Sequence, residues 1–308
     1  MSQKIIALIY DFDSTLSPEC MQEALFKKYN VDGNTFWAEK RGLMKNAESK
    51  GINYDTECAY MNLILRYIRE GHMRDGKFTS EGKFPLLSNL SFQELGKDIV
   101  LYPGLPEFLP HIKEKIEEDE RYEAEGITLE HYVISTGLKE MIVGSSVGRY
   151  LEGIFASEYN TDGNGTICEI ARTVGHTKKT EFLHLINKGG NKDSNIDVNG
   201  ILPRELRRIP FENMIYIGDG PTDVPCFATL NHRGGISIGV YSPHSQEAFD
   251  KAYQLREQGR VFSFGEADYR EGSHTYMTIE RAVREIAERI IRKQDEAQKK
   301  GRREGPRL

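Results

Sequence analysis

Two pairs of aspartates follow strongly apolar segments of the chain. Asp11 and Asp13 come directly after the most apolar segment of the chain, and Asp219 and Asp223 follow a second such segment. Ligands of an open parallel sheet bind beyond the carboxyl ends of its strands, so we expect all four carboxylates to share one crevice. Clustered carboxylates raise one another's pKa unless a cation neutralises them. A ligand set made only of oxygen favours Mg²⁺, which often binds substrate phosphate as well.

Two further segments carry groups that suit an anionic ligand. Ser135-Thr136-Gly137 ends another apolar segment and places two hydroxyls at a turn into a helix, where they can donate to an anionic oxygen. Lys178 and Lys179 open a later helix, and an ammonium group there can neutralise phosphate charge and hold a neighbouring acid. Each signal alone is common in proteins without catalytic use. Their joint occurrence at the ends of separate predicted strands favours one shared site.

The elements that must position these residues are short, buried strands that alternate with helices. This alternation predicts a parallel α/β sheet. The expected strands are Ile5–Tyr10, His131–Ser135, Met214–Ile217, Ile236–Val240 and Arg260–Phe264. Helical spacing is expected after Leu138, from about Lys179 to Ile186, and in a last helix with Ile279, Val283, Ile286, Ala287 and Ile290 on one face. Asp162-Gly163 lies between two alternating runs and predicts a β-hairpin.

The long interval between the first two strands predicts an insertion. About 120 residues separate them, whereas a βαβ crossover needs only a few tens. Residues 17–101 lack strand alternation, and breaks at Asp32-Gly33, Lys50-Gly51 and a polar loop from Gly71 to Lys83 are typical of separate helices. Ser91 and Glu94 have capping-box spacing before the last of these helices.

These breaks define the expected domains. We expect a core made of residues 1–16 and 102–292, a helical cap at 17–101, and a basic, disordered C-terminal tail at 293–308.

Composition limits the class of partner. The chain has 308 residues, 38% hydrophobic and 29% charged, with a formal net charge of -6. This excludes wholesale disorder and gives no global positive field for nucleic acid or an anionic membrane. No apolar run approaches the roughly 20 residues of a membrane span, and the four scattered cysteines lack metal or disulfide spacing. We expect a cytoplasmic protein with a small-molecule partner, and neither nucleic acid nor membrane as partner.

Taken together, the motifs resemble the haloacid dehalogenase superfamily of aspartyl-phosphate-forming enzymes, most of all its phosphoserine phosphatase branch. The motif DxDxT matches Asp11, Asp13 and Thr15, the strand-ending hydroxyl matches Ser135, the lysine matches Lys179 in preference to Lys178, and GDxxxD matches Asp219 and Asp223. The resemblance implies a Rossmann-like parallel sheet core with a helical cap inserted after the first motif.

The resemblance also implies the chemistry, a Mg²⁺-dependent phosphomonoesterase that acts on a small phosphorylated metabolite. Asp11 would be the nucleophile and Asp13 the general acid and base, which is the group that proton transfer to an alkoxide requires. The implied metal residues are Asp11, Asp13 (through its carbonyl), Asp219 and Asp223, and the implied phosphate or substrate contacts are Ser135, Thr136, Gly137, Lys179 and Glu19. A phosphotransferase, a phosphomutase and a catalytically silent binding module on the same fold remain alternatives.

Three positions depart from the phosphoserine phosphatase pattern. Thr136 stands where that branch has the first of two glycines after the motif serine. That branch carries a glutamate nine residues after the nucleophile, whereas Glu19 comes eight residues after Asp11. Its substrate-carboxylate arginine would fall near Met61, and Arg66 is the nearest candidate. We therefore expect that phosphoserine is not the best substrate.

Overall fold

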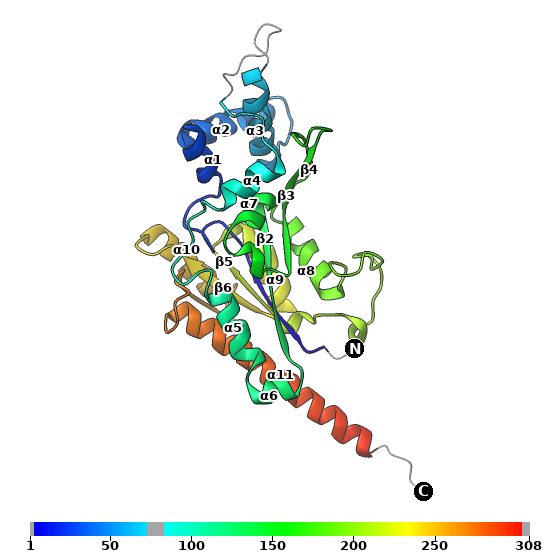
Figure 1. The fold of residues 1–308 in the computed structure, drawn as a ribbon. Helices are drawn as coiled ribbons and strands as arrows, with labels where there is room; N and C mark the ends of the chain where they lie inside the picture. Colours follow the sequence, from blue (N-terminus) through cyan, green and yellow to red (C-terminus); the bar gives the residue numbers. More distant parts are fainter. Residues whose placement is uncertain (1–2, 73–82, 304–308) are drawn as a thin grey trace.

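The computed structural model describes residues 3–72 and 83–303, and a seven-stranded sheet forms its centre (Figure 1). The strand order is β4-β3-β2-β1-β5-β6-β7, and all neighbours are parallel except the antiparallel hairpin of β3 and β4. The strands are β1 (Ile5–Tyr10), β2 (Thr128–Leu138), β3 (Gly153–Thr161), β4 (Ile167–Arg172), β5 (Met214–Gly218), β6 (Ile236–Tyr241) and β7 (Ser263–Glu266). The predicted parallel α/β sheet is confirmed.

The described helices either cover the two faces of this sheet or form the insertion between β1 and β2 (Figure 1). They are α1 (Gln22–Tyr29), α2 (Gly33–Glu48), α3 (Thr56–His72), α4 (Asn89–Gly96), α5 (Phe108–Glu117), α6 (Glu120–Ala124), α7 (Lys139–Gly144), α8 (Lys178–Lys188), α9 (Val224–His232), α10 (Gln246–Glu257) and α11 (His274–Arg303). Short 3₁₀ turns lie at Gly148–Tyr150, Arg204–Leu206, Phe211–Asn213 and Pro221–Asp223. None of the helices within the described ranges is both long and apolar enough to cross a bilayer.

Alternation along β1 shows how the sheet separates two cores. Ile6, Leu8 and Tyr10 belong to the apolar cluster that includes α5 and α11. Ala7 and Ile9 point to the opposite face and join the cluster that includes α8 and α9. Because side chains alternate along a strand and both faces are covered, β1 must be apolar at every position.

The predicted helical insertion is present between β1 and α5. In Figure 1, α1 to α4 lie together beyond the end of the sheet at which β1 ends. Their shared core is aromatic: ring centroids lie 4.8 Å apart for Phe26 and Phe36, and 5.3 Å apart for Tyr67 and Phe84. Most of the polar loop predicted from Gly71 to Lys83 lies outside the described residues.

The capping box predicted at Ser91 and Glu94 is wrong by one helical turn. Ser88 is the N-cap of α4: its hydroxyl accepts from the Ser91 amide, while the Ser91 hydroxyl accepts from the Ser88 amide. A second serine thus replaces the glutamate of the usual pattern and satisfies the same free amides. The Glu94 carboxylate instead pairs with Lys97 at 2.7 Å.

The last predicted strand begins later in the chain than expected, because the preceding helix ends in a turn. We expected Arg260–Phe264, but β7 begins at Ser263. The Arg260 amide donates to the Leu255 carbonyl and thereby closes the end of α10, so this residue belongs to the turn.

The tail that we expected to be disordered is helical as far as the structure describes it. Helix α11 continues to Arg303, past the boundary expected at residue 293, and residues 304–308 lie outside the described ranges. Lys, Arg, Gln, Glu and Ala favour helix, and an existing helix extends without a new nucleus. The residues predicted for its apolar face, Ile279, Val283, Ile286, Ala287 and Ile290, are all buried.

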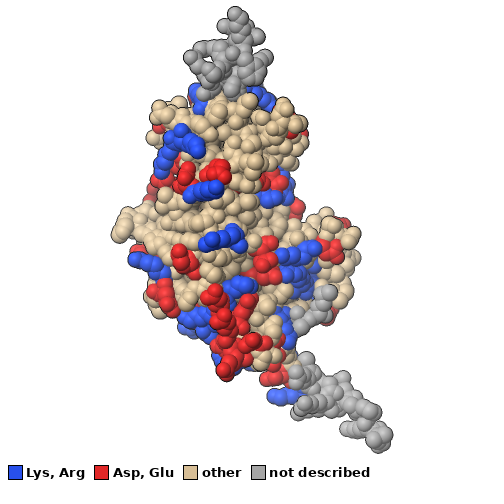
Figure 2. Space-filling model, in the orientation of Figure 1, with Lys and Arg blue, Asp and Glu red and all other residues tan. Residues whose placement is uncertain are grey.

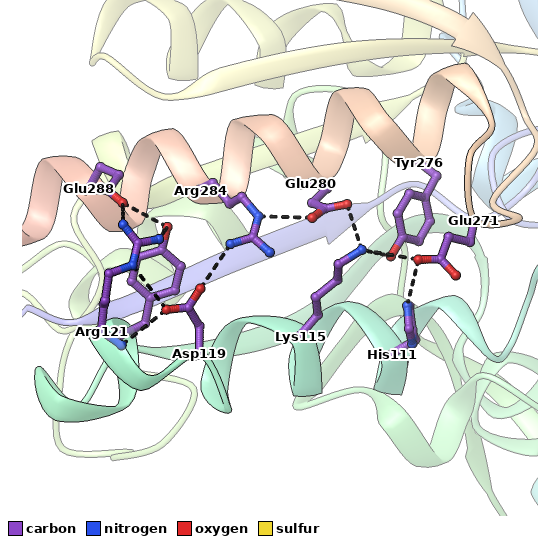
Figure 3. A network of polar contacts seen from close by, with 10 residues as sticks. His111, Lys115, Asp119, Arg121, Glu271, Tyr276, Glu280, Arg284 and Glu288 are labelled. Carbon is purple, nitrogen blue, oxygen red and sulfur yellow. Dashed lines mark hydrogen bonds and ion pairs between the residues drawn. The ribbon is translucent and has the colours of Figure 1, made fainter.

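A network of polar contacts joins α11 to α5 and α6 (Figure 3). The Lys115 ammonium lies 3.2 Å from Glu271 and 3.1 Å from Glu280. Arg284 bridges Glu280, at 3.0 Å, and Asp119, at 3.3 Å. Acidic side chains gather over α5 and α6 in Figure 2. Such partly exposed pairs contribute about 1 kcal/mol or less each, so the buried apolar face of α11 is its main anchor.

Candidate active site

The loop after β1 brings Asp11 to the carboxyl end of the sheet. The Asp11 amide donates to the Ile217 carbonyl at 2.9 Å and so prolongs the β1–β5 pairing by one residue. The chain then turns sharply, with the Leu16 amide bonded to the Phe12 carbonyl and Ser14 in the left-handed region at φ 59°. The Phe12 amide donates to Asp11 Oδ1 at 2.7 Å. The carboxylate is therefore fixed by its own loop.

The loop after β5 brings Asp219 and Asp223 to the same place. Asp223 is fully buried, and a Cβ on Gly218 would lie 2.3 Å from its Oδ2. Glycine is thus required where β5 ends, because the loop folds Asp223 back over the strand. Carboxylate oxygens of Asp11, Asp219 and Asp223 all lie within 4.8 Å of one another. Three of the four predicted acids meet in one cluster.

Lys179 is the cation of this cluster. Its ammonium, which has no solvent exposure, lies 2.7 Å from Asp11 Oδ2 and 2.8 Å from Asp223 Oδ1. Burial alone would lower the pKa of Lys179, but the two carboxylates raise it, so the group stays charged. Lys178 is half-exposed and forms none of these contacts within the described residues. Between the two lysines that the sequence offered, Lys179 is therefore the one that reaches the acids.

The electrostatics of the cluster fit a divalent cation. Burial, followed by the charge of Asp223, raises the pKa of Asp11 to about 6, and burial with Asp11 raises the pKa of Asp219 well above its usual value. Three carboxylates against one ammonium leave two negative charges. Asp223 Oδ2 is buried without a hydrogen-bond partner among the described residues. An all-oxygen donor set with this excess charge is what Mg²⁺ requires.

The carboxylate of Asp13 stands apart from the other three. Its Oδ1 accepts from the Met21 amide at 3.0 Å, at the start of the helical insertion. Burial, followed by the charge of Asp11, raises the pKa of Asp13 to about 7. Asp13 is not among the described residues whose side chains converge on a common ion. Its carboxyl group is therefore available for proton transfer.

The hydroxyl-bearing segment Ser135–Gly137, expected as a turn after a strand that ends at Ser135, instead lies inside β2, which continues to Leu138. This segment lies beside the insertion. Ser135 is buried, and its Oγ accepts from the Gly137 amide at 3.0 Å. The Thr136 carbonyl accepts from the Tyr60 hydroxyl, at 3.0 Å, on α3. A Cβ on Gly137 would lie 2.3 Å from the Met21 methyl group. This part of β2 thus contacts Met21, at the start of the insertion, and Tyr60 of α3.

Glu19 is not brought to the acid cluster. Its side chain is half exposed and pairs with Lys27 at 2.7 Å. With Cys20 and Met21 it lines a pocket of about 370 Å³ between the start of α1 and residues 98–100. Met21 links the pocket to the acid, because it lines the pocket while its amide binds the Asp13 carboxylate. Glu19 therefore belongs to the wall of an adjacent pocket.

No charged side chain stands at Met61, near which the resemblance implies an arginine that binds the substrate carboxylate. Met61 is buried, and its carbonyl accepts from the Tyr159 hydroxyl at 2.8 Å. Arg66, the alternative candidate, is exposed on α3.

The sequence did not reveal two residues that touch the site. The Tyr216 hydroxyl donates to Asp223 Oδ1 at 2.8 Å, and the Met21 sulfur accepts from the Leu138 amide at 3.0 Å. A tyrosine in a fully buried strand was the available signal for the first, because its hydroxyl must find a partner. Nothing in the sequence pointed to the second.

Comparison with known proteins agrees with this architecture. A probable phosphoserine phosphatase from Vibrio cholerae, in its unliganded form, superimposes with a TM-score of 0.50 at 13% identity, over 94% of this chain and 67% of that one. A haloacid dehalogenase family hydrolase from Salmonella enterica serovar Typhi gives a TM-score of 0.48 at 18% identity, over 78% of this chain; the alignment spans 64% of that hydrolase. The chain therefore shares the fold of this probable phosphoserine phosphatase.

One curated protein is similar in sequence over most of this chain. An uncharacterized protein of Borreliella burgdorferi is 30% identical over 295 residues, which cover 90% of this chain and 96% of that protein. The chain belongs to the same family as this Borreliella protein. No protein-family model matches the chain.

Proposed function

We propose that this protein is a Mg²⁺-dependent phosphomonoesterase that hydrolyses a small phosphorylated metabolite through an aspartyl-phosphate on Asp11. The cluster of Asp11, Asp219 and Asp223 around Lys179 carries the proposal. It combines a fixed carboxylate nucleophile with an excess of two negative charges at the ligand-binding edge of the sheet. A pocket of about 370 Å³ lined by Met21, whose amide binds Asp13, suits a small leaving group.

The metal residues follow from the same cluster. Asp11, Asp219 and the unpartnered Oδ2 of Asp223 would hold Mg²⁺, directly or through a water molecule. The ion supplies charge neutralisation that lets a carboxylate approach an anionic phosphoryl group.

The side chains divide the two half-reactions between them. Asp11 attacks phosphorus and forms the carboxyl–phosphate bond as the bond to the leaving oxygen breaks. Asp13 gives its proton to that oxygen and then takes a proton from the water that cleaves the aspartyl-phosphate. A pKa of about 7 allows Asp13 to act as acid and then as base near neutral pH. Ser135 and Lys179 would bind the phosphoryl oxygens, with the neighbouring Thr136 and Gly137 as further contacts.

A panel of phosphomonoesters, assayed with Mg²⁺ and with EDTA, tests the proposal. We expect phosphate release that EDTA abolishes and Mg²⁺ restores, and none from Asp11→Asn purified in parallel as a control for contaminating phosphatases. Because a buried methionine stands where the carboxylate-binding arginine was expected, phosphoserine should not rank first in kcat/KM. Equal activity of wild type and Asp11→Asn would contradict the proposal.

A further inference from the structure

Two donors hold one oxygen of Asp223. The Tyr216 hydroxyl and the Lys179 ammonium each lie 2.8 Å from Oδ1, whereas Oδ2 is buried without a partner among the described residues. We propose that Tyr216 is a positioning residue for the metal: with Lys179, it fixes the Asp223 carboxylate so that Oδ2 faces the bound cation. This inference rests on the proposed Mg²⁺ site.

The ring of Tyr216 is enclosed by the core. It is fully buried in β5, and it meets Phe227 of α9 edge-on at 5.7 Å between centroids. The hydroxyl therefore reaches Asp223 from a rigid strand rather than from a loop. Donors on rigid elements orient a metal-binding carboxylate better than mobile ones do.

The orientation matters because a carboxylate can rotate. With Oδ1 occupied by two donors, rotation of the group would break two hydrogen bonds, one of them to a charged donor. The loop adds a steric limit, because Gly218 leaves only the space that Oδ2 fills. Mg²⁺ demands near-octahedral geometry, so a carboxylate that is already oriented binds it more tightly than a freely rotating one.

Tyr132 offers a matched control. It lies fully buried in β2, and its hydroxyl also donates to a carboxylate, that of Glu130. That carboxylate pairs with Arg208 and is not part of the acid cluster. Tyr132→Phe and Tyr216→Phe thus remove the same group from the same sheet, and only the second removal touches Asp223.

Mg²⁺ titration calorimetry of the substrate-free protein tests the inference. Tyr216→Phe should weaken Mg²⁺ binding by about 10- to 100-fold, the range typical of groups that orient metal ligands. Tyr132→Phe should bind Mg²⁺ as wild type does. Thermal unfolding in EDTA checks that both variants fold. In turnover assays, Tyr216→Phe should need more Mg²⁺ for half-maximal rate and recover most of kcat at saturating Mg²⁺.

A double variant separates positioning from general loss of structure. If Tyr216 acts through Asp223, then Tyr216→Phe should cause no further loss of Mg²⁺ affinity once Asp223→Asn is present. Additive losses, or wild-type affinity in Tyr216→Phe, would overturn the inference and leave the proposed function standing. Weakened Mg²⁺ binding in a protein that cleaves no phosphomonoester would support the inference and refute the function. A wild type that binds no Mg²⁺ would overturn both.

Discussion

Lys179 and Asp11 form an ion pair that is shielded from water. Their charged atoms lie 2.7 Å apart, and the lysine side chain has no solvent exposure. The same ammonium binds Asp223, so one cation serves two carboxylates from different strands. Substrate phosphate would add further negative charge here, so we expect both folding and the proposed phosphate binding to depend on Lys179.

Replacement of this lysine should therefore be costly. Lys179→Gln leaves two buried carboxylates without their cation, and we expect a loss of about 3 to 5 kcal/mol in unfolding free energy together with loss of turnover. Lys178→Gln alters the adjacent, half-exposed lysine and should keep both properties near wild type. Urea unfolding and p-nitrophenyl phosphate turnover measure the two effects. Equal losses in both variants would show that Lys179 has no special role.

The glycine that ends β5 allows a steric test of the cluster. A methyl group on Gly218 would lie 2.3 Å from Asp223 Oδ2, so Gly218→Ala must displace that carboxylate. We expect at least a 100-fold loss of turnover and destabilisation of about 1 to 3 kcal/mol. Gly220→Ala is the control: Gly220 has φ -175°, which any residue adopts, and a Cβ there meets nothing within 4 Å. Comparable turnover in the two variants would mean that Asp223 need not stay in place.

The features that sequence predicted well are those with local signals. Ile5–Tyr10 is apolar at every position because both of its faces are covered, and Asp162-Gly163 marks the hairpin turn by residue type alone. The acids after β1 and β5 could be grouped because parallel strands end at one edge of the sheet. Such arguments need only neighbouring residues and a general rule of topology.

Contacts between distant segments could not be predicted from the sequence. Met21 binds the Leu138 amide across 117 positions, and the partner of Tyr216 depends on how the loop after Gly218 folds back. The resemblance placed Glu19 among the substrate contacts in spite of its spacing, yet Lys27 of α1 engages its carboxylate. The helical tail was missed because its basic composition was weighed above the helix propensity of its residues.

A buried histidine should control how stability depends on pH. His131 lies in β2 with one ring nitrogen 2.9 Å from the Leu109 carbonyl and the other 3.2 Å from the Tyr10 hydroxyl. Burial lowers its pKa from 6.5 to about 3. Below pH 6.5 this histidine binds a proton in the unfolded chain, whereas in the folded protein it stays neutral down to about pH 3. The unfolding free energy should therefore fall by about 1.4 kcal/mol per pH unit between roughly pH 6 and pH 4 through this group alone.

His131→Gln isolates this contribution. The variant should be less stable at pH 7, because it loses hydrogen-bond geometry in a buried site. Its disadvantage should shrink as the pH falls, since glutamine does not titrate. Urea unfolding of both proteins from pH 7 to pH 4 measures the difference, in which the other acids largely cancel. Parallel pH profiles would show that His131 is protonated in the folded state.

The roles of Asp11 and Asp13 can be separated with p-nitrophenyl phosphate, whose phenolate leaves without a proton. Asp11→Asn lacks the nucleophile and should give neither a burst of product nor turnover. Asp13→Asn keeps the nucleophile, so its first step should proceed, but it has no base for hydrolysis of the aspartyl-phosphate. We expect close to one equivalent of nitrophenolate, followed by a stall with phosphate held on Asp11.

Intact-mass spectrometry after acid quench detects that adduct directly. It should appear in Asp13→Asn and be absent from Asp11→Asn, which serves as the control. The structure gives a reason for the separation: the Asp13 carboxylate binds the Met21 amide and is not one of the three carboxylates that converge among the described residues. Its removal should therefore leave the nucleophile and the metal site intact. If both variants lack burst and adduct, Asp13 is needed before the first bond forms, and the proposed assignment of acid and base is wrong.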